Sequence, residues 1–362
     1  MRWQVAVDEI ETPALVVDLD VMERNIAALA AVILGAGKAW RPHFKSLRAI
    51  EIARRAIAAG ATGLTCATSD EAEFLVAAGV DDILIANQIV STAKLLRLAR
   101  LCRKARIMVA ADSAEQIDAM ASAAAAAGTR LGVLIEMDIG LGRSGVRFES
   151  DVVALAQKSA RSPQLCFMGL MGWEGHACAI EDGDAKQTAV GTALARLADA
   201  RSALAAAGLP PSVVSAGGSG SFRQAVAAGS VTEIQAGGAI LGDLLQQDLY
   251  RTGLDCALTV HATVTSQPAA SRAICDAGFK ALSAEYFSPR IASPAGLPPH
   301  RIELSAEHGT ITFDAPCLGP RVGDRVVFLV GYADSTTFRH SRMHARRGDR
   351  IEAVWPLFRP GA

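Results

Sequence analysis

Several features that mark whole classes of protein are absent from this sequence. None of its seven cysteines forms a CxxC pair, and free thiols in a reducing compartment are the expected state. No apolar run approaches the ~20 residues of a transmembrane helix, and the first residues, MRWQVAVDEIETP, lack the apolar stretch of a signal peptide. The net charge of -1 leaves no basic surplus for nucleic acid. We therefore expect a cytoplasmic enzyme with no membrane and no nucleic acid among its partners.

A repeating β/α pattern is present instead, from about residue 39 to residue 250. Its short runs are apolar on both faces, as in a parallel sheet covered by helices. Eight such units over about 210 residues fit a TIM (β/α)8 barrel, and an open doubly wound sheet rarely shows eight evenly spaced units. The predicted strands are Ala39–His43, Gly63–Ala67, Ile83–Ala86, Ile107–Ala110, Gly132–Glu136, Phe167–Met171, Val213–Ala216 and Thr232–Gln235. The predicted helices are roughly 47–60, 69–79, 91–105, 113–128, 150–161, 184–208, 221–228 and 239–248.

The pattern changes after about residue 255, where short strands alternate with Pro, Gly and Asp turns. This predicts a second, mostly antiparallel β domain. Ala14–Asp18 is a further strand that the pattern alone places in neither unit, and the Pro-rich segment Phe287–His300 is expected to be an exposed loop. The predicted strands of this part are Cys256–Ser266, Ala273–Asp276, Lys280–Ser283, Arg301–Leu304, Gly309–Phe313 and Arg325–Leu329.

Lys45 is the first candidate for chemistry. It follows an apolar and aromatic stretch at the end of the first barrel strand and directly precedes a helix. A lysine at such a place is a candidate covalent anchor for an aldehyde cofactor, because burial can free its amine as a nucleophile. A surface lysine or a structural ion pair is the alternative.

Polar and glycine residues gather at the ends of the other strands, where a barrel carries its function. The segment Gly217–Ser221 follows a strand and opens a helix, so its bare backbone amides suit a phosphate, although a tight turn would look the same. A lysine combined with a phosphate cradle suggests pyridoxal 5'-phosphate, an electron sink for an amino acid carbanion. The candidate cofactor-binding residues are His43, Lys45, Arg143, Trp173, Ser215, Gly217, Gly218, Ser219, Gly220, Gln235 and Gly237.

Three of the strand-end residues have open alternatives. Arg143 could contact the cofactor's phenolic oxygen or a substrate carboxylate, or it could form an ion pair with Asp138. His176 could be a general acid or base, or a hydrogen-bonded loop histidine. Trp173 could be a flat wall for a ring or a core residue.

At these residues the chain resembles the D-threonine aldolase and D-serine dehydratase-like family, whose barrel is of the alanine racemase type (fold type III). The resemblance spans almost the whole chain, and the order and spacing of the segments make it specific. The matching segments are Glu11–Asp18, Arg41–Lys45, Asp138–Gly140, Arg143–Val146, Gly172–His176, Gly217–Gly220, Thr232–Gly237, Asp276–Gly278, Lys280–Ser283, Ala306–Gly309, Val322–Val326 and Val354–Pro356.

The resemblance implies Lys45 as the Schiff-base lysine, Gly217–Gly220 as the phosphate cradle and Arg143 near the cofactor. It implies a barrel over residues 20–250 and a β domain built from residues 1–19 with 251–362. It further implies a homodimer, with each active site near the β domain of the partner.

The resemblance also makes two departures visible. The family usually has a His-x-Cys or His-x-Asp pair near the C-terminus that holds a divalent metal, and Tyr332 stands at the histidine position here, with Asp334 at the second. Asp334 remains the candidate ligand, and His340 and His344 could substitute, but one carboxylate and a phenol make a poor site for Mn²⁺ or Zn²⁺. A divalent metal (Mn, Mg or Zn) is therefore doubtful. The second departure is Trp173, where the family more often has tyrosine.

These observations predict a pyridoxal phosphate-dependent lyase that cleaves a D-β-hydroxy amino acid by a retro-aldol reaction. The candidate catalytic residues are Lys45, His176, Tyr332 and Asp334. A racemase ranks second because it needs no β-hydroxyl chemistry. A dehydratase of the D-serine or 3-hydroxyaspartate type ranks third, because hydroxide is the hardest group to activate without the metal pair. A non-catalytic protein that binds the cofactor is a further alternative.

Overall fold

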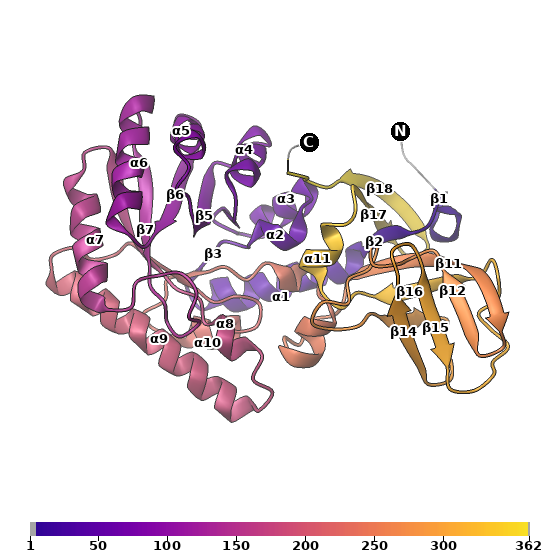
Figure 1. Cartoon of the computed structure of the whole chain (residues 1–362). Helices are drawn as coiled ribbons and strands as arrows, with labels where there is room; N and C mark the ends of the chain where they lie inside the picture. The colour runs from indigo at the N-terminus through magenta and orange to yellow at the C-terminus, as the bar shows by residue number, and fades with distance from the viewer. Residues whose placement is uncertain (1–4, 361–362) are drawn as a thin grey trace.

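The computed structural model describes residues 5–360, which form a parallel barrel and a second sheet at opposite ends of the molecule (Figure 1). The predicted domain ranges include residues 1–4 and 361–362, which lie outside the described residues. The two sheets agree with the predicted fold class, and the exact domain limits stay a prediction. All seven cysteines are free, as expected. No helix in the described part of the chain is long and apolar enough to cross a membrane.

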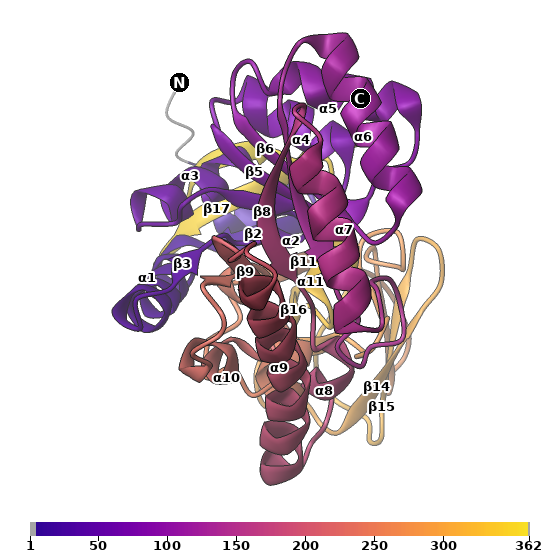
Figure 2. The same ribbon diagram turned by 90° about the vertical axis from the view of Figure 1, so that its left-hand side faces the viewer.

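The barrel consists of eight parallel strands, and all eight predicted strands are present. A parallel bridge between His43 and Thr65 joins the two ends of the sheet. The strands are almost entirely buried because helices cover the sheet; in Figure 2, α7 and α9 lie outside β8. In pairing order the strands are β3 (Ala39–Trp40), β10 (Glu233–Ile234), β9 (Val213–Ala216), β8 (Leu165–Met171), β7 (Leu131–Glu136), β6 (Arg106–Ala111), β5 (Asp82–Gln88) and β4 (Leu64–Cys66).

Three differences from the predicted helices are large, and the short helices α8 (Gly175–Cys178) and α11 (Ala333–Thr337) were not predicted either. A 17-residue helix, α1, precedes the first barrel strand; Asp18 caps it by accepting a hydrogen bond from the Val21 amide at 3.0 Å. The predicted helix 47–60 begins earlier and is broken at Arg48, which has a left-handed backbone (φ 54°). The helices are α1 (Leu19–Gly35), α2 (Phe44–Leu47), α3 (Ile50–Ala58), α4 (Ser69–Ala77), α5 (Thr92–Leu101), α6 (Ala114–Ala127), α7 (Glu149–Arg161), α8 (Gly175–Cys178), α9 (Gly183–Ala206) and α10 (Phe222–Ala227).

The third difference is the predicted helix 239–248, which was wrong as a continuous helix. The chain instead forms a 3₁₀ turn, η2 (Gly238–Ile240), and a π turn, η3 (Leu245–Leu249). Gly242 separates them at φ 64°, and a Cβ there would lie 2.3 Å from the carbonyl oxygen of Asp255. Only glycine accepts that combination of conformation and close approach without strain.

The second sheet is mostly antiparallel, as predicted, and β2 (Ala14–Asp18) runs through its middle between β11 and β17. Lys280–Ser283 was wrongly predicted as a strand and forms a turn, whereas β13 lies within the segment expected to be a loop. Three further strands, β1, β17 and β18, were not predicted. The remaining elements are β1 (Val5–Ala6), the 3₁₀ turn η1 (Val7–Glu9), β11 (Leu258–Ala269), β12 (Arg272–Cys275), β13 (Arg290–Ser293), β14 (His300–Leu304), β15 (Gly309–Phe313), β16 (Arg325–Leu329), α11 (Ala333–Thr337), β17 (Arg342–Arg347) and β18 (Arg350–Pro356).

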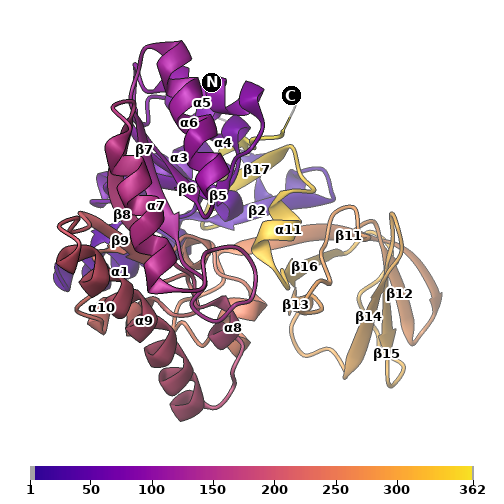
Figure 3. The same ribbon diagram turned by 60° about the vertical axis from the view of Figure 1, so that its left-hand side comes forward.

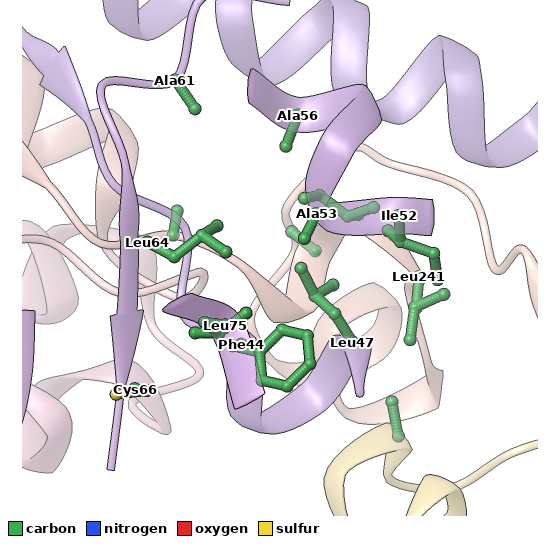
Figure 4. Close-up of a cluster of buried hydrophobic side chains, with 14 of the residues drawn as sticks. Phe44, Leu47, Ile52, Ala53, Ala56, Ala61, Leu64, Cys66, Leu75 and Leu241 are labelled. Carbon is green, nitrogen blue, oxygen red and sulfur yellow. The ribbon is translucent and has the colours of Figure 1, made fainter. Parts of the chain in front are cut away.

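Two features of the fold position the residues at the end of β3. Phe44 and Leu47 of α2 are fully buried in an apolar cluster, shown with its neighbours in Figure 4, and each such side chain contributes about 1.5–3 kcal/mol of burial free energy. Their burial fixes the backbone of Lys45, which lies between them. The second feature is α11, which lies between the barrel and the second sheet in Figures 1 and 3. The contacts between α11 and α2 bring the two parts of the chain together.

Candidate active site

A cavity of about 420 Å³ opens at the carboxyl ends of the barrel strands and reaches the segment that begins α11. It gathers most of the residues predicted from the sequence, including two from beyond residue 330. The predicted residues that line it are His43, Lys45, Arg143, Trp173, Gly218, Ser219, Gly220, Gln235, Gly237, Tyr332 and Asp334. The predicted residues outside its lining are His176, Ser215 and Gly217.

Lys45 projects into this cavity from α2. Its Nζ lies 3.3 Å from Oδ2 of Asp334 and 5.8 Å from the centre of the Trp173 ring. The side chain is 44% exposed, so the lysine is less buried than its apolar sequence context suggests. The amide of Lys45 donates to Nδ1 of His43 at 3.3 Å. Burial and the nearby charges of Lys45 and Arg143 hold the pKa of His43 well below its usual value, so this ring is a neutral acceptor.

Asp334 is the centre of a hydrogen-bond cluster. Ser46 donates to its Oδ1, and the hydroxyl of Tyr332 donates to its Oδ2 at 2.8 Å. Burial and the adjacent Asp334 charge raise the pKa of Tyr332 above its usual value, so the phenol keeps its proton. Asp334 is therefore an ionisable acceptor beside the lysine, whereas Tyr332 is a donor.

Asp243 holds this cluster in place, and the sequence analysis did not single it out. Its Oδ1 accepts the Gln246 amide and its Oδ2 accepts the Ala333 amide, each at 2.8 Å. The side chain is fully buried, and burial raises its pKa to about 7 despite these two bonds. An acidic residue within the apolar run AILGDLL was the signal that could have found it.

The glycine segments after β9 and β10 form a bare cradle on the barrel side of the cavity. A Cβ on Gly218 would lie 2.8 Å from Nε1 of Trp173, and one on Gly237 would lie 2.4 Å from the amide nitrogen of His43. The hydroxyl of Ser219 accepts the Ala239 amide at 3.0 Å and so ties the two segments together. Burial raises the pKa of Glu174, whose Oε1 accepts a hydrogen bond from the hydroxyl of Ser221 at the end of this segment.

Gln235 lines the cavity, and hydrogen bonds to the residues behind it fix the orientation of its side chain. Its Nε2 donates to the hydroxyl of Ser215 at 3.0 Å, and that hydroxyl donates to Glu233 at 2.8 Å. Glu233 in turn pairs with the buried Arg41, which also pairs with Asp82, each at 2.8 Å. Ser215 is fully buried, so the structure places it behind Gln235 rather than in the cavity wall.

Arg143 and Trp173 form one wall. The guanidinium carbon lies 5.2 Å from the centre of the indole ring, within the range of a cation–π interaction. The alternative partner of Arg143, Asp138, pairs with Arg147 at 3.2 Å instead. Arg143 is therefore directed to the cavity, and Trp173 presents a flat face to it.

His176 is not brought to the cavity. It is exposed on α8, and its ring packs where a Cβ on Gly140 would lie, 2.6 Å from Cε1. The structure gives no support to His176 as the general acid or base.

Comparisons with known proteins agree with this geometry. Residues 17–244 match the family model described as alanine racemase, N-terminal domain, and residues 257–345 match the putative serine dehydratase domain. The chain is 33% identical to D-threonine aldolase of an Arthrobacter species, over 96% of this chain and 92% of that protein. The chain belongs to the D-threonine aldolase and D-serine dehydratase-like family.

Two further members are similarly close. A 3-hydroxy-D-aspartate aldolase from Paracoccus denitrificans (strain Pd 1222) is 32% identical over 96% of this chain and 92% of its own length. The crystal structure of D-threonine aldolase from Filomicrobium marinum superposes with a TM-score of 0.93 at 31% identity, covering 98% of this chain and 97% of that one. The family resemblance inferred from the sequence is thus confirmed over almost the whole chain.

The cofactor of this family is pyridoxal 5'-phosphate, and the residues present here fit it. Lys45 supplies an amine inside the cavity, and Trp173 supplies a flat wall for a ring. The cradle of Gly218 and Gly237 leaves space that any larger residue would fill. We expect Ser219 and Gly220 to meet the phosphate, and Gln235 to meet the ring.

The residues present do not fit a divalent metal. Asp334 accepts from Ser46 and Tyr332 and pairs with Lys45, so three of its roughly four lone-pair sites already face donors. Nε2 of His340 lies 2.8 Å from the carbonyl oxygen of Ala281, and His344 belongs to β17, so neither joins Asp334. Within residues 5–360, no three His, Cys, Asp or Glu side chains are arranged to hold a metal ion.

Proposed function

We propose that this protein is a pyridoxal phosphate-dependent lyase that cleaves a D-β-hydroxy amino acid into glycine and an aldehyde. The observation that carries the proposal is the carboxylate of Asp334 at 3.3 Å from Nζ of Lys45. The amine of an amino acid substrate must reach the position of this nitrogen. Its β-hydroxyl, a few bonds away, then lies within reach of Asp334 and Tyr332.

Each residue has a separate task in this mechanism. Pyridoxal phosphate, when bound, would supply an electron-withdrawing ring beside Cα for the electron pair of the broken Cα–Cβ bond. Lys45 holds the cofactor covalently, Arg143 binds a carboxylate or the phenolic oxygen, and Asp334 takes the proton of the β-hydroxyl. The Cα–Cβ bond then breaks, the aldehyde leaves, and Cα receives a proton to become glycine.

Tyr332 supports Asp334 in this role. Its hydroxyl donates to Oδ2 and keeps its proton, so it orients the carboxylate and does not compete as a base. Ser46 does the same at Oδ1. Oriented acceptors of this kind are a general requirement for proton transfer, which contributes roughly 10²- to 10⁴-fold to rates.

A product assay tests the proposal. Purified holoenzyme incubated with D-threonine should release glycine and acetaldehyde in equal amounts. Lys45→Ala should release neither, and borohydride should no longer fix the cofactor to the chain. A borohydride-stable link in Lys45→Ala would disprove the assignment of the anchor.

A dehydratase is the second candidate, because residues 257–345, which include Asp334, match a serine dehydratase domain. It would release ammonia and a keto acid instead of glycine. A racemase would exchange the Cα proton in D₂O without releasing either product. Measuring ammonia, keto acid and exchange of the Cα proton in D₂O beside glycine and acetaldehyde therefore separates the three reactions.

We also infer a cytoplasmic homodimer, with the barrel over residues 20–250 and the second domain over residues 5–19 and 251–360. The free cysteines favour a reducing compartment. Three large apolar or aromatic side chains near the second sheet are 50–70% exposed, namely Phe279, Phe338 and Tyr286, and a partner subunit would cover them. Sedimentation equilibrium of the holoenzyme should give twice the mass of the 37.8 kDa chain.

A further inference from the structure

We propose that Gln235 presents its carbonyl oxygen to the cofactor, and that three buried residues behind it decide this orientation. A hydrogen-bond acceptor at this place favours a cofactor ring that carries a proton on its nitrogen. The inference rests on the proposed function, because it concerns the electron sink that this function needs. The three positioning residues are Arg41, Glu233 and Ser215.

The strands bring these side chains into one line inside the barrel. Glu233 and Gln235 are two residues apart, so their side chains leave the β10 segment on the same side. Ser215 of β9 pairs with Glu233 in the parallel register, and Arg41 follows β3, the other neighbour of β10. The side chains of Arg41, Glu233 and Ser215 are at most 3% exposed, whereas Gln235 lines the cavity. The line therefore runs from a buried charge to the site.

Arg41 begins the line as a donor. Its Nε donates to Oε2 of Glu233, and a terminal nitrogen of its guanidinium donates to Oδ1 of Asp82, each at 2.8 Å. Burial lowers the pKa of Arg41, but the charges of Glu233 and Asp82 outweigh burial and raise it above its ordinary value. A charged guanidinium has donors only. Glu233 therefore meets Arg41 as an ionised carboxylate.

The direction of donation passes from Glu233 through Ser215. A carboxylate only accepts, so the hydroxyl of Ser215 gives its single proton to Oε1 of Glu233, at 2.8 Å. The lone pairs of that hydroxyl then need a donor, and the amide nitrogen of Gln235 supplies it at 3.0 Å. The amide oxygen stands at the other end of the group. It is therefore turned away from Ser215, towards the cavity.

An acceptor at this place suits one group of pyridoxal phosphate. The phenolic oxygen and the phosphate carry negative charge and need donors, which Arg143, Ser219 and Gly220 can provide. The aldehyde is the partner of Lys45. The ring nitrogen remains, and it can donate to an oxygen only after it has taken a proton from water. Gln235 in this orientation thus favours the protonated ring, which withdraws electrons more strongly.

Glu233→Gln inverts the line without changing the size of the side chain. The oxygen of the new amide must face Arg41, which only donates, so its nitrogen faces Ser215. The proton of Ser215 is then free for Gln235, whose oxygen turns towards the serine. The amide nitrogen of Gln235 now faces the cavity as a donor. A donor favours the ring nitrogen without a proton.

Solid-state ¹⁵N NMR of the holoenzyme, loaded with pyridoxal phosphate labelled at the ring nitrogen, reports this proton before any substrate is added. We expect a protonated nitrogen in the unaltered enzyme and a mainly unprotonated one in Glu233→Gln. Glu71→Gln is the matched control and should keep the proton. Glu71 is a similarly buried carboxylate that accepts the amides of Ala67 and Thr68, away from Gln235. An unprotonated nitrogen in the unaltered enzyme, or equal signals in it and in Glu233→Gln, would overturn the inference.

Ser215→Ala breaks the line but keeps the ion pair of Arg41 and Glu233, so it decides the question even where Glu233→Gln fails to fold. The pH at which half of the ring nitrogen is protonated should fall by about one unit, because an oriented hydrogen bond to a charged group is worth about tenfold. Combining Glu233→Gln with Ser215→Ala should give the same value as Ser215→Ala alone, since the effect passes through the serine. An unchanged value in Ser215→Ala would refute the positioning role.

Glycine release from D-threonine, measured on the same preparations, separates this inference from the proposed function. No glycine from an unaltered enzyme with a protonated ring nitrogen would remove the lyase and leave the orientation of Gln235 in place. Glycine from an enzyme whose ring nitrogen is unprotonated would overturn the orientation and leave the lyase.

Discussion

The amine of Lys45 and the carboxylate of Asp334 lie 3.3 Å apart, although they belong to opposite ends of the chain. The lysine follows the first barrel strand, and the aspartate stands on α11, beside the second sheet. Asp243 connects the two parts by accepting the Ala333 amide. The cavity therefore has its acceptor only when the two parts of the chain are docked.

Asp334→Asn removes the acceptor charge and keeps the size of the side chain. We expect kcat for glycine release to fall about 10²- to 10⁴-fold, because the amide cannot take the β-hydroxyl proton. The cofactor should still be fixed to the chain by borohydride, since Lys45 is unchanged. Asp118→Asn, at an exposed ion pair with Lys158, is the control and should keep full activity. An Asp334→Asn enzyme within twofold of normal would exclude Asp334 as the base.

Removal of divalent metal should leave the activity of this enzyme unchanged, because the donors around Asp334 do not suit a metal. The check is glycine release after exhaustive dialysis against EDTA, with and without added Mn²⁺. Tyr332→His restores a His-x-Asp pair and should bind Mn²⁺, measured by the EPR signal of the free ion. Activity that disappears with EDTA and returns with Mn²⁺ in the unaltered enzyme would contradict this prediction.

Gly218→Ala should weaken cofactor binding. The new Cβ would lie 2.8 Å from Nε1 of Trp173 and occupy the cradle. We expect the dissociation constant for pyridoxal phosphate to rise about 10-fold or more, as a misfit of this size costs about 1–3 kcal/mol. Gly229→Ala, where no atom lies within 4 Å of the new Cβ, is the matched control. Fluorescence titration of the apoenzyme gives both constants, and equal values would argue against the cradle.

Asp243→Asn should change how stability depends on pH. The folded pKa of Asp243 is about 7, above its ordinary value of 3.8, so between these values the folded protein retains a proton that the unfolded chain has lost. This group's contribution to the free energy of unfolding therefore falls as pH rises from about 4 to 7, by at most about 1.4 kcal/mol per pH unit. The variant lacks this contribution.

Urea unfolding of both proteins at several pH values measures the effect. The difference in unfolding free energy, normal minus variant, should decrease across this range and level off above pH 7. A difference that stays constant with pH would show that Asp243 does not titrate there.

The barrel could be predicted from sequence because its strands are short runs buried on both faces; all six residues of Leu131–Glu136 are buried. The strands β17 and β18 could not, since arginines at Arg342, Arg346 and Arg347 hide their alternation. The helix expected over 239–248 failed because nothing in the sequence shows that Asp255 approaches Gly242.

The same distinction between local pattern and distant contact explains which residues of the site could be predicted from the sequence. Lys45, Gly218 and Gly237 could be predicted because the topology of a barrel brings all strand ends to one face. His176 could not be placed, because its direction depends on how the short helix α8 turns after β8. Asp243 was missed because its role exists only when residues 330–334 dock against it, a contact that no local pattern reveals.

The position of β2 in the second sheet bears on the order in which the molecule forms. This strand is made among the first, yet its neighbours β11 and β17 are made among the last. Ser46 and its partner Asp334 are 288 residues apart, so at ~5–20 residues per second a ribosome needs roughly 15 to 60 s to pass from one to the other. In the last part of that interval, after β10 has been made, the nascent barrel presents its lysine without the aspartate. An emerging chain can therefore meet its cofactor well before it can turn over a substrate.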